Sequence, residues 1–213
     1  MTPRIIGSIF TMILIIGCET KTTSDQNEIT SDTINTKDSA EVKKVTSDSL
    51  TSNDDFNYSD CIRGQAKSVT NKTIFPNAVF KLNQDNHTGT ETLELKDRDK
   101  LIIHNWGCKY YVLTFRFETD RFEADTTNTV FWLNKATILM TEIENGLNAP
   151  LDIKGGINAI PIYLASLDSQ PYNLRDEIVY DDDVIRDFVT LDRIQKISEG
   201  RFAIEISFAT GPL

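Results

Sequence analysis

One segment of nine residues, 110–118 (YYVLTFRFE), constrains the fold more than any other. From Tyr111 to Phe117 every second residue is large and apolar, and Thr114 and Arg116 stand between them. A period of two is typical of an antiparallel strand with one buried and one hydrated face. Burying such side chains contributes on the order of 1.5–3 kcal/mol each, which requires a covering layer. We therefore predict that this segment is the central strand of a sheet.

Other segments show the same alternation around turn-forming residues. Residues 75–82 predict an edge strand, and residues 93–103 predict a hairpin that turns at an Asp-Arg-Asp sequence. Residues 202–208 alternate cleanly and predict a strand. Residues 188–197 fit either a helix or a strand, and their Val, Thr and Phe content favours a strand. The polar residues 83–90 predict a loop.

Two helices are expected between these groups of strands. Asn128 or Thr129 can cap a helix that runs to about Asn145 and stops at Gly146. Its expected buried stripe consists of Leu133, Ala136, Met140 and Ile143. A second apolar stripe consists of Ile153, Ile157, Ile160 and Leu164. The residues that count against this second helix are Gly155, Gly156 and Pro161.

Strands, then helices, then strands predict an α+β fold in which about two helices pack on an antiparallel sheet. We expect this single globular domain to span residues 56–213, because aromatic residues and cysteine appear from Phe56 onward. The 213-residue chain carries a net charge of −10. Such a charge argues against nucleic acid and anionic lipid as electrostatic partners, because both attract clustered Lys and Arg.

The N-terminal residues predict export and attachment to a membrane. Arg4 precedes an apolar run over residues 5–16, which is too short to span a bilayer as a helix and has the length of a signal-peptide core. The run ends in Gly17-Cys18 and resembles the lipobox of bacterial lipoproteins. The resemblance implies that residues 1–17 are removed and that Cys18 carries the lipid. A signal peptide cut elsewhere and an uncleaved signal anchor are the alternatives.

The lipoprotein resemblance also implies a location. The protein is expected in a bacterial cell envelope, on the outer rather than the inner membrane, with its domain in the periplasm or on the cell surface. The protein would bind the membrane through the lipid on Cys18, because each CH₂ of an acyl chain that is buried in the bilayer contributes ~0.8 kcal/mol to binding.

Residues 19–55 predict a disordered tether between the lipid and the domain. Fourteen of these 37 residues are Ser or Thr, nine are acidic and four are Lys, so they cannot bury enough apolar surface to fold. Thr33, Ser39 and Ser49 each follow Asp and precede a small or aliphatic residue. This resembles the O-glycosylation sequon of Bacteroidota, and a plain flexible spacer is the favoured alternative. The Asp125-Thr126-Thr127 triplet also fits the sequon.

The three cysteines divide into one anchor and one pair. With Cys18 lipidated, Cys61 and Cys108 remain, and an even pair in an exported protein predicts a disulfide. A thiolate pair of Cys108 with His104 is the alternative, but no orienting acid or family motif accompanies it.

Few other residues suggest chemistry. Asp181, Asp182 and Asp183 with Glu177 and Asp187 could hold Ca²⁺, but their spacing lacks an EF-hand pattern and a solvated acidic turn is favoured.

Two aromatic residues near an expected strand end, Trp106 and Tyr110, could belong to a ligand surface or simply pack. We expect no catalytic residue, no metal and no cofactor, because no phosphate loop, dinucleotide turn or nucleophile elbow is present.

The sequence therefore favours a tethered, non-catalytic module that binds a protein, a glycan or another envelope partner. A structural subunit of an envelope assembly is the first alternative, and a large exposed apolar patch would indicate it. A hydrolase with an acidic site is the second, and a cleft with convergent carboxylates would indicate it.

Overall fold

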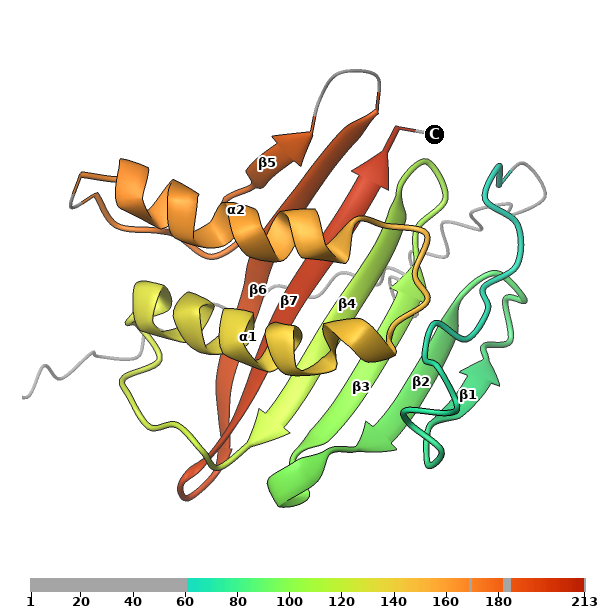
Figure 1. Cartoon of the computed structure of the whole chain (residues 1–213), viewed down its shortest axis with the longest axis horizontal. Helices are drawn as coiled ribbons and strands as arrows, with labels where there is room; N and C mark the ends of the chain where they lie inside the picture. Colours follow the sequence, from blue (N-terminus) through green and yellow to red (C-terminus); the bar gives the residue numbers. More distant parts are fainter. Residues whose placement is uncertain (1–60, 169, 182–184, 213) are drawn as a thin grey trace, which may run out of the picture. The chain divides into compact units, whose positions relative to one another are not determined.

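The computed structural model describes residues 61–212, apart from residue 169 and residues 182–184 (Figure 1). The expectations for the leader, Cys18, the tether and its sequons at Thr33, Ser39 and Ser49 concern residues outside this described part. The same holds for the expected start of the domain at Phe56.

A single seven-stranded sheet organises the described residues, and all of its neighbouring strands are antiparallel. The strand order is β1-β2-β3-β4-β7-β6-β5. The strands are β1 (Val79–Leu82), β2 (Gly89–Glu94), β3 (Lys100–Trp106), β4 (Tyr111–Thr119), β5 (Ile178–Asp181), β6 (Arg186–Ser198) and β7 (Arg201–Gly211). The predicted central strand is therefore confirmed as the fourth of seven, and residues 188–197 form a strand.

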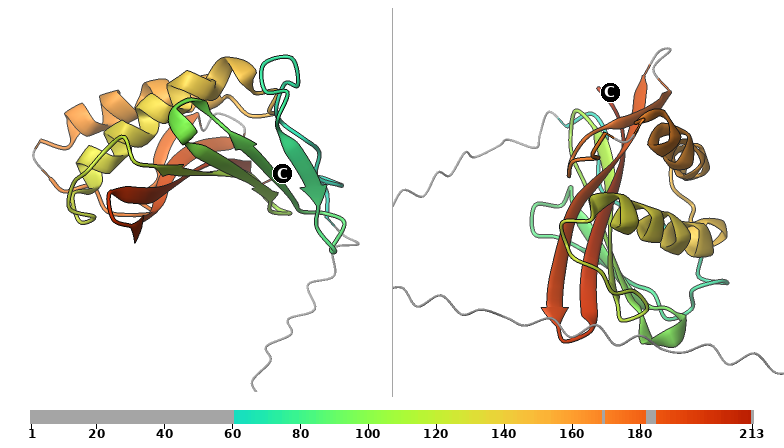
Figure 2. Two further views of the ribbon diagram at one scale, coloured as in Figure 1. Left: turned by 90° about the horizontal axis from the view of Figure 1, so that it is seen from below. Right: turned by 90° about the vertical axis from the view of Figure 1, so that its left-hand side faces the viewer.

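Both α-helices cover the same face of this sheet (Figures 1 and 2). Helix α1 (Thr129–Ile143) begins after Asn128, whose side chain accepts a hydrogen bond from the backbone N–H of Phe131, and continues into a 3-10 turn, η3 (Glu144–Gly146). Helix α2 (Ile153–Ser166) begins after Asp152, which caps the N–H of Gly155 in the same way. Neither is long and apolar enough to cross a membrane, and no other helix among the described residues is either.

The core lies between the helices and the face of the sheet that they cover. All four residues of the predicted α1 stripe are buried there, together with the alternate apolar residues of β4 and β7. Phe115 of β4 meets Phe208 of β7 edge to face, with 5.9 Å between ring centroids. An added Cβ at Gly156 would lie 2.6 Å from the Phe208 ring, so this glycine allows α2 to approach β7. The glycines that argued against a second helix are thus part of its packing, and the α+β prediction is confirmed.

Two local predictions were wrong. The edge strand begins at Val79 rather than Phe75, because Phe75 closes a turn by donating its N–H to Asn71 O at 2.8 Å. The loop predicted over residues 83–90 is shorter, since β2 begins at Gly89.

The second face of β4 is also less hydrated than predicted. Val112 and Thr114 on that face are buried, at 7% and 9% exposure, whereas Arg116 and Glu118 remain partly exposed. Thr114 can be buried there because its hydroxyl is hydrogen-bonded to Trp106 and Ser207.

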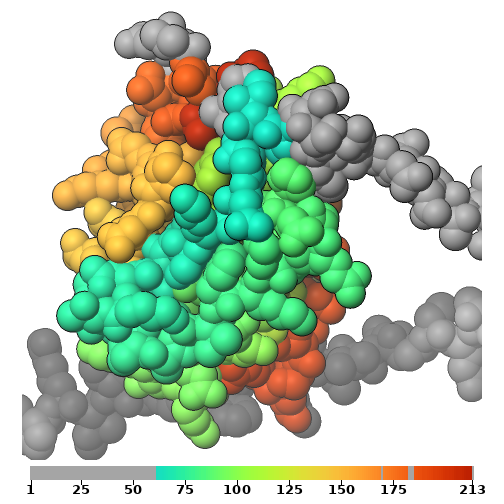
Figure 3. Space-filling model, turned by 90° about the vertical axis from the view of Figure 1, so that its right-hand side faces the viewer, coloured from blue at the N-terminus to red at the C-terminus, as the bar shows by residue number. Residues whose placement is uncertain are grey.

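A strap of residues 61–78 runs beside the sheet before β1 begins. In Figure 3 its cyan segment lies between the helices and the green strands at the β1–β2 side. The buried carboxylate of Glu91 on β2 holds the strap, because it accepts hydrogen bonds from Ser68 Oγ at 2.6 Å, from the N–H groups of Val69 and Thr70, and from Thr70 Oγ1. The strap also bridges to Leu147 after α1.

Candidate functional site

The face of the sheet opposite the helices carries an exposed, fixed tryptophan. Trp106 ends β3 with 47% of its surface exposed, whereas the other tryptophan, Trp132, is fully buried in the core. The indole Nε1 of Trp106 donates a hydrogen bond to Thr114 Oγ1 on β4 at 2.9 Å. The ring is therefore held in one orientation while its surface remains open to solvent.

That hydrogen bond is the first link of a chain across four strands. Thr114 Oγ1 lies 2.7 Å from Ser207 Oγ on β7, and Ser207 in turn donates to Asp192 Oδ2 on β6. Because the single hydroxyl proton of Ser207 is used on Asp192, Thr114 must donate to Ser207. Thr190 Oγ1 donates to the other carboxylate oxygen of Asp192 at 2.7 Å. The chain thus runs in one direction, from the indole to a carboxylate.

The environment of Asp192 marks it as the anchor of this chain. Desolvation by burial raises the pKa of Asp192, while the hydrogen bonds from Ser207 and Thr190 act in the opposite direction. A half-buried carboxylate that accepts two hydroxyl donors orients both of them. Asp192 therefore acts on Trp106 through Ser207 and Thr114.

Two hollows flank the Trp106 ring. The larger, of about 680 Å³, is lined mainly by apolar groups, among them Tyr110, Val112 and Phe188. Tyr110 and Phe188 meet edge to face with 6.2 Å between centroids. Its few charges include Lys109 and Glu177, and Glu177 forms an ion pair with Arg186.

The smaller hollow, of about 310 Å³, is lined by residues with polar side chains, although carbon atoms make up most of the surface that they expose to it. These residues include Asn83, Thr88 and His104, whereas the Asn105 amide is bonded to Lys67 and Tyr111 and the Thr114 hydroxyl to Trp106 and Ser207. Trp106 and Thr88 line both hollows.

The turn that carries this surface is fastened to the strap. The disulfide between Cys61 and Cys108 has a Cα–Cα distance of 5.1 Å, within the usual range. Gly107 has φ +93°, and an added Cβ would lie 2.2 Å from the carbonyl oxygen of Tyr110, so only glycine fits this turn. Arg63 of the strap donates to the carbonyl oxygen of Trp106.

Arg63 makes further contacts that position it. Its guanidinium donates to Asn105 Oδ1 at 2.6 Å and lies over the Tyr111 ring, 4.7 Å from the centroid. The backbone beneath Trp106 is thus braced by residues that follow Cys61 directly.

Charged residues lie farther down the same face. Arg116 pairs with Glu205 at 2.6 Å and with Glu118 at 3.1 Å. Desolvation lowers the pKa of His104, and the positive charge of Arg116 adds to this while Glu205 opposes it. His104 is therefore a neutral hydrogen-bonding group near pH 7.

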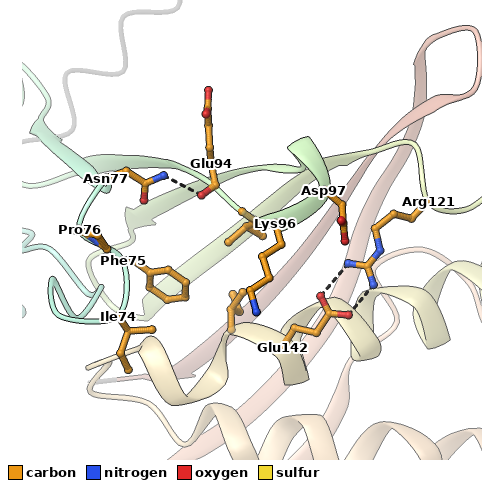
Figure 4. A pocket seen from close by; sticks show the side chains of 11 residues that line it. Ile74, Phe75, Pro76, Asn77, Glu94, Lys96, Asp97, Arg121 and Glu142 are labelled. Carbon is orange, nitrogen blue, oxygen red and sulfur yellow. Dashed lines mark hydrogen bonds and ion pairs between the residues drawn. The ribbon is translucent and has the colours of Figure 1, made fainter.

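A third hollow, of about 690 Å³, lies on the opposite side of β2 and β3, between the β2–β3 turn, the strap and α1 (Figure 4). Arg121 makes three hydrogen bonds there: it donates to both carboxylate oxygens of Glu142 at 2.8 and 2.6 Å and to the buried Asp99 at 3.3 Å. The hydrogen bonds with Arg121 lower the pKa of Glu142. The ion pair of Arg121 and Glu142 forms part of the wall of this hollow, and we propose no ligand for it.

The structure separates the candidates that the sequence suggested. The predicted Cys61–Cys108 disulfide is confirmed, so Cys108 forms no thiolate pair with His104. Asp182 and Asp183 lie outside the described residues, so the choice between a Ca²⁺ site and a solvated turn stays open. Thr126 of the Asp125-Thr126-Thr127 triplet is exposed.

Sequence reasoning missed most of this surface. It singled out Trp106 and Tyr110, which the structure places on one hollow together with Phe188. It did not find Asp192 or Ser207, because they lie on strands far along the chain and only the strand pairing brings them to Thr114.

No protein family model, curated protein or solved structure matches this chain. The argument for function therefore rests on the site itself.

Proposed function

We propose that this protein is a membrane-anchored binding module of a bacterial cell envelope, and that the surface around Trp106 is its ligand site. One observation carries the proposal: a large aromatic ring is held exposed by a directional hydrogen-bond chain, on a face that neither described helix covers. Exposed aromatic residues whose orientation is fixed in advance bind at low entropic cost. The lipobox at Cys18 and the acidic residues 19–55 support tethering to a membrane.

The alternatives have less support. A hydrolase with an acidic site would need convergent carboxylates in a cleft. Asp192 lines neither hollow beside Trp106, and its carboxylate already accepts two hydroxyl hydrogen bonds. A structural subunit would need a broad apolar surface, whereas exposed large apolar residues such as Ile62, Val79 and Ile162 lie on separate elements, the strap, β1 and α2.

Site-specific photo-cross-linking in intact envelopes tests the proposal. A photoreactive residue at Lys109, which lines the larger hollow, should form a discrete adduct. The matched control is Ile162, which is 72% exposed on α2 in the helical layer. Equal adducts at both positions, or none at Lys109, would contradict the proposed site.

A further inference from the structure

The two sides of Trp106 have different chemistry, and together they define a ligand. The larger hollow offers the rings of Tyr110 and Phe188 and the side chain of Val112, which give it a mainly apolar lining. The smaller offers amide, hydroxyl and imidazole groups. A ligand that covers the indole must therefore present carbon-bound hydrogens to the ring and several hydroxyl or amide groups beside it.

The charge of the surface around Trp106 limits the class of ligand that it can bind. The protein as a whole carries −10, which repels polyanions such as nucleic acids and acidic polysaccharides. Lys109 and Glu177 give the larger hollow one charge of each sign, and Glu177 is already paired with Arg186. His104 contributes hydrogen bonds without a net charge. The residues that line the smaller hollow include no Asp, Glu, Lys or Arg, so an uncharged part of a ligand matches that side of Trp106.

The position of the surface argues against an extended peptide. A peptide that extends a sheet pairs with the free backbone groups of an edge strand. Trp106 lies on β3, and β3 is paired on both sides, with β2 and with β4. Recognition at Trp106 must therefore come mainly from side chains, those of β3 and those of the loops that carry Asn83, Thr88 and Tyr110.

We infer that Trp106 is a stacking platform for a sugar ring of a neutral polysaccharide, with Asn83, Thr88 and His104 as hydrogen-bonding partners of its hydroxyl groups. This inference rests on the proposed function and names its ligand class. The apolar face of a pyranose lies flat on an aromatic ring, and its equatorial hydroxyls point sideways. A volume of about 310 Å³ on the polar side is at the lower end for small-ligand sites, which suits one or two sugar rings.

Asp192 has a positioning role in this site. It lies three hydrogen bonds away from the indole and touches no part of either hollow. Replacing it by Asn removes one of the two acceptor oxygens and the negative charge, so the Ser207 and Thr190 hydroxyls can no longer both donate to separate oxygens and are held less firmly. The indole ring of Trp106 would stay at the same place but rotate more freely.

Tryptophan fluorescence tests the inference on the full-length chain in a detergent without a sugar headgroup. Acrylamide should quench Trp106, whereas Trp132 is fully buried and serves as the internal reference. The probes are hexamers of β-1,4-linked N-acetylglucosamine, of β-1,4-linked glucose and of α-1,4-linked glucose. At least one should protect Trp106 from acrylamide.

Two variants separate stacking from general structure. Trp106→Ala should weaken calorimetric binding of the protecting hexamer by about tenfold or more, as expected for an aromatic hot spot. Asp192→Asn should leave Trp106 in place but raise its quenching in the free protein and weaken binding by a smaller factor. Ile162→Ala, in the helical layer, should change neither measurement.

The outcomes distinguish the inference from the proposed function beneath it. One outcome is that no hexamer protects Trp106 and that proteinase, but not periodate, destroys the Lys109 adduct. The ligand is then a protein, so the sugar inference is wrong and the proposed binding function stands. If no hexamer protects Trp106 and no adduct forms, both are wrong. If a hexamer protects Trp106 but Trp106→Ala leaves the calorimetric affinity for that hexamer unchanged, the stacking platform is also wrong.

Discussion

Removing the disulfide should destabilise the domain by a calculable amount. Cys61 and Cys108 are 47 residues apart. In the chain-entropy model a crosslink that closes a loop of this length lowers the entropy of the unfolded chain by an amount worth roughly 4 kcal/mol at 25 °C. Small domains are stable by only about 5–15 kcal/mol, so this is a large share.

The measurement is urea and thermal unfolding of the Cys61→Ala/Cys108→Ala protein. The free energy of unfolding should fall by up to about 4 kcal/mol, and the melting temperature by roughly 8–16 °C for a domain of this size. The matched control is Cys18→Ala, which removes the one cysteine outside the bond and should leave both values unchanged.

The same variant should also loosen the turn of residues 107–109, which lines the larger hollow, so Trp106 should become easier to quench. A fall of less than about 1 kcal/mol with unchanged quenching would refute the reasoning. It would show that the strap and turn are held by Arg63 and Glu91 without the crosslink.

Three further predictions follow from other parts of the chain. Glu91→Gln should lower the free energy of unfolding by about 2–3 kcal/mol, because a buried acceptor of four hydrogen bonds loses its charge, and hydrogen exchange at Val69 and Thr70 should accelerate; unchanged exchange would argue against this. The raised pKa of Asp192 means that its ionisation costs stability at neutral pH. The free energy of unfolding of the wild type should therefore rise relative to that of Asp192→Asn as the pH falls from 7 through the pKa of folded Asp192, and it should level off below the unfolded pKa near 3.8. A difference between the two proteins that does not change with pH would contradict this. Cys18→Ser should abolish acylation and membrane fractionation, as intact-mass analysis would show; normal fractionation would refute the lipobox assignment.

Much of the fold could be predicted because its patterns are local. The alternation in residues 110–118 and 202–208 identifies strands, since a strand presents successive side chains to opposite faces. The apolar stripe that ends at Ile143 and the stop at Gly146 identify α1, because a helix places residues three or four apart on one face. Cys61 and Cys108, the two cysteines besides the expected lipid anchor at Cys18, predict one bond.

Other features depended on contacts that no local pattern contains. Phe75 looked like a strand residue, but it packs its ring close to Gly146, which has no Cβ to block it. Gly156 looked like a helix breaker, but Phe208 fills the space that a side chain would need.

The sequence by itself determined the class of elements, their order, the disulfide pair and the expectation of a lipid anchor at Cys18. The tertiary structure alone decided that Trp106 is exposed while Trp132 is buried, because both are the same residue type and only the covering layer differs. It also decided that a hydrogen-bond chain links Asp192 to Trp106, since the link passes through Thr114 and Ser207 on β4 and β7. Those strands are 93 residues apart in the chain at the Thr114–Ser207 contact, and antiparallel pairing alone brings them together.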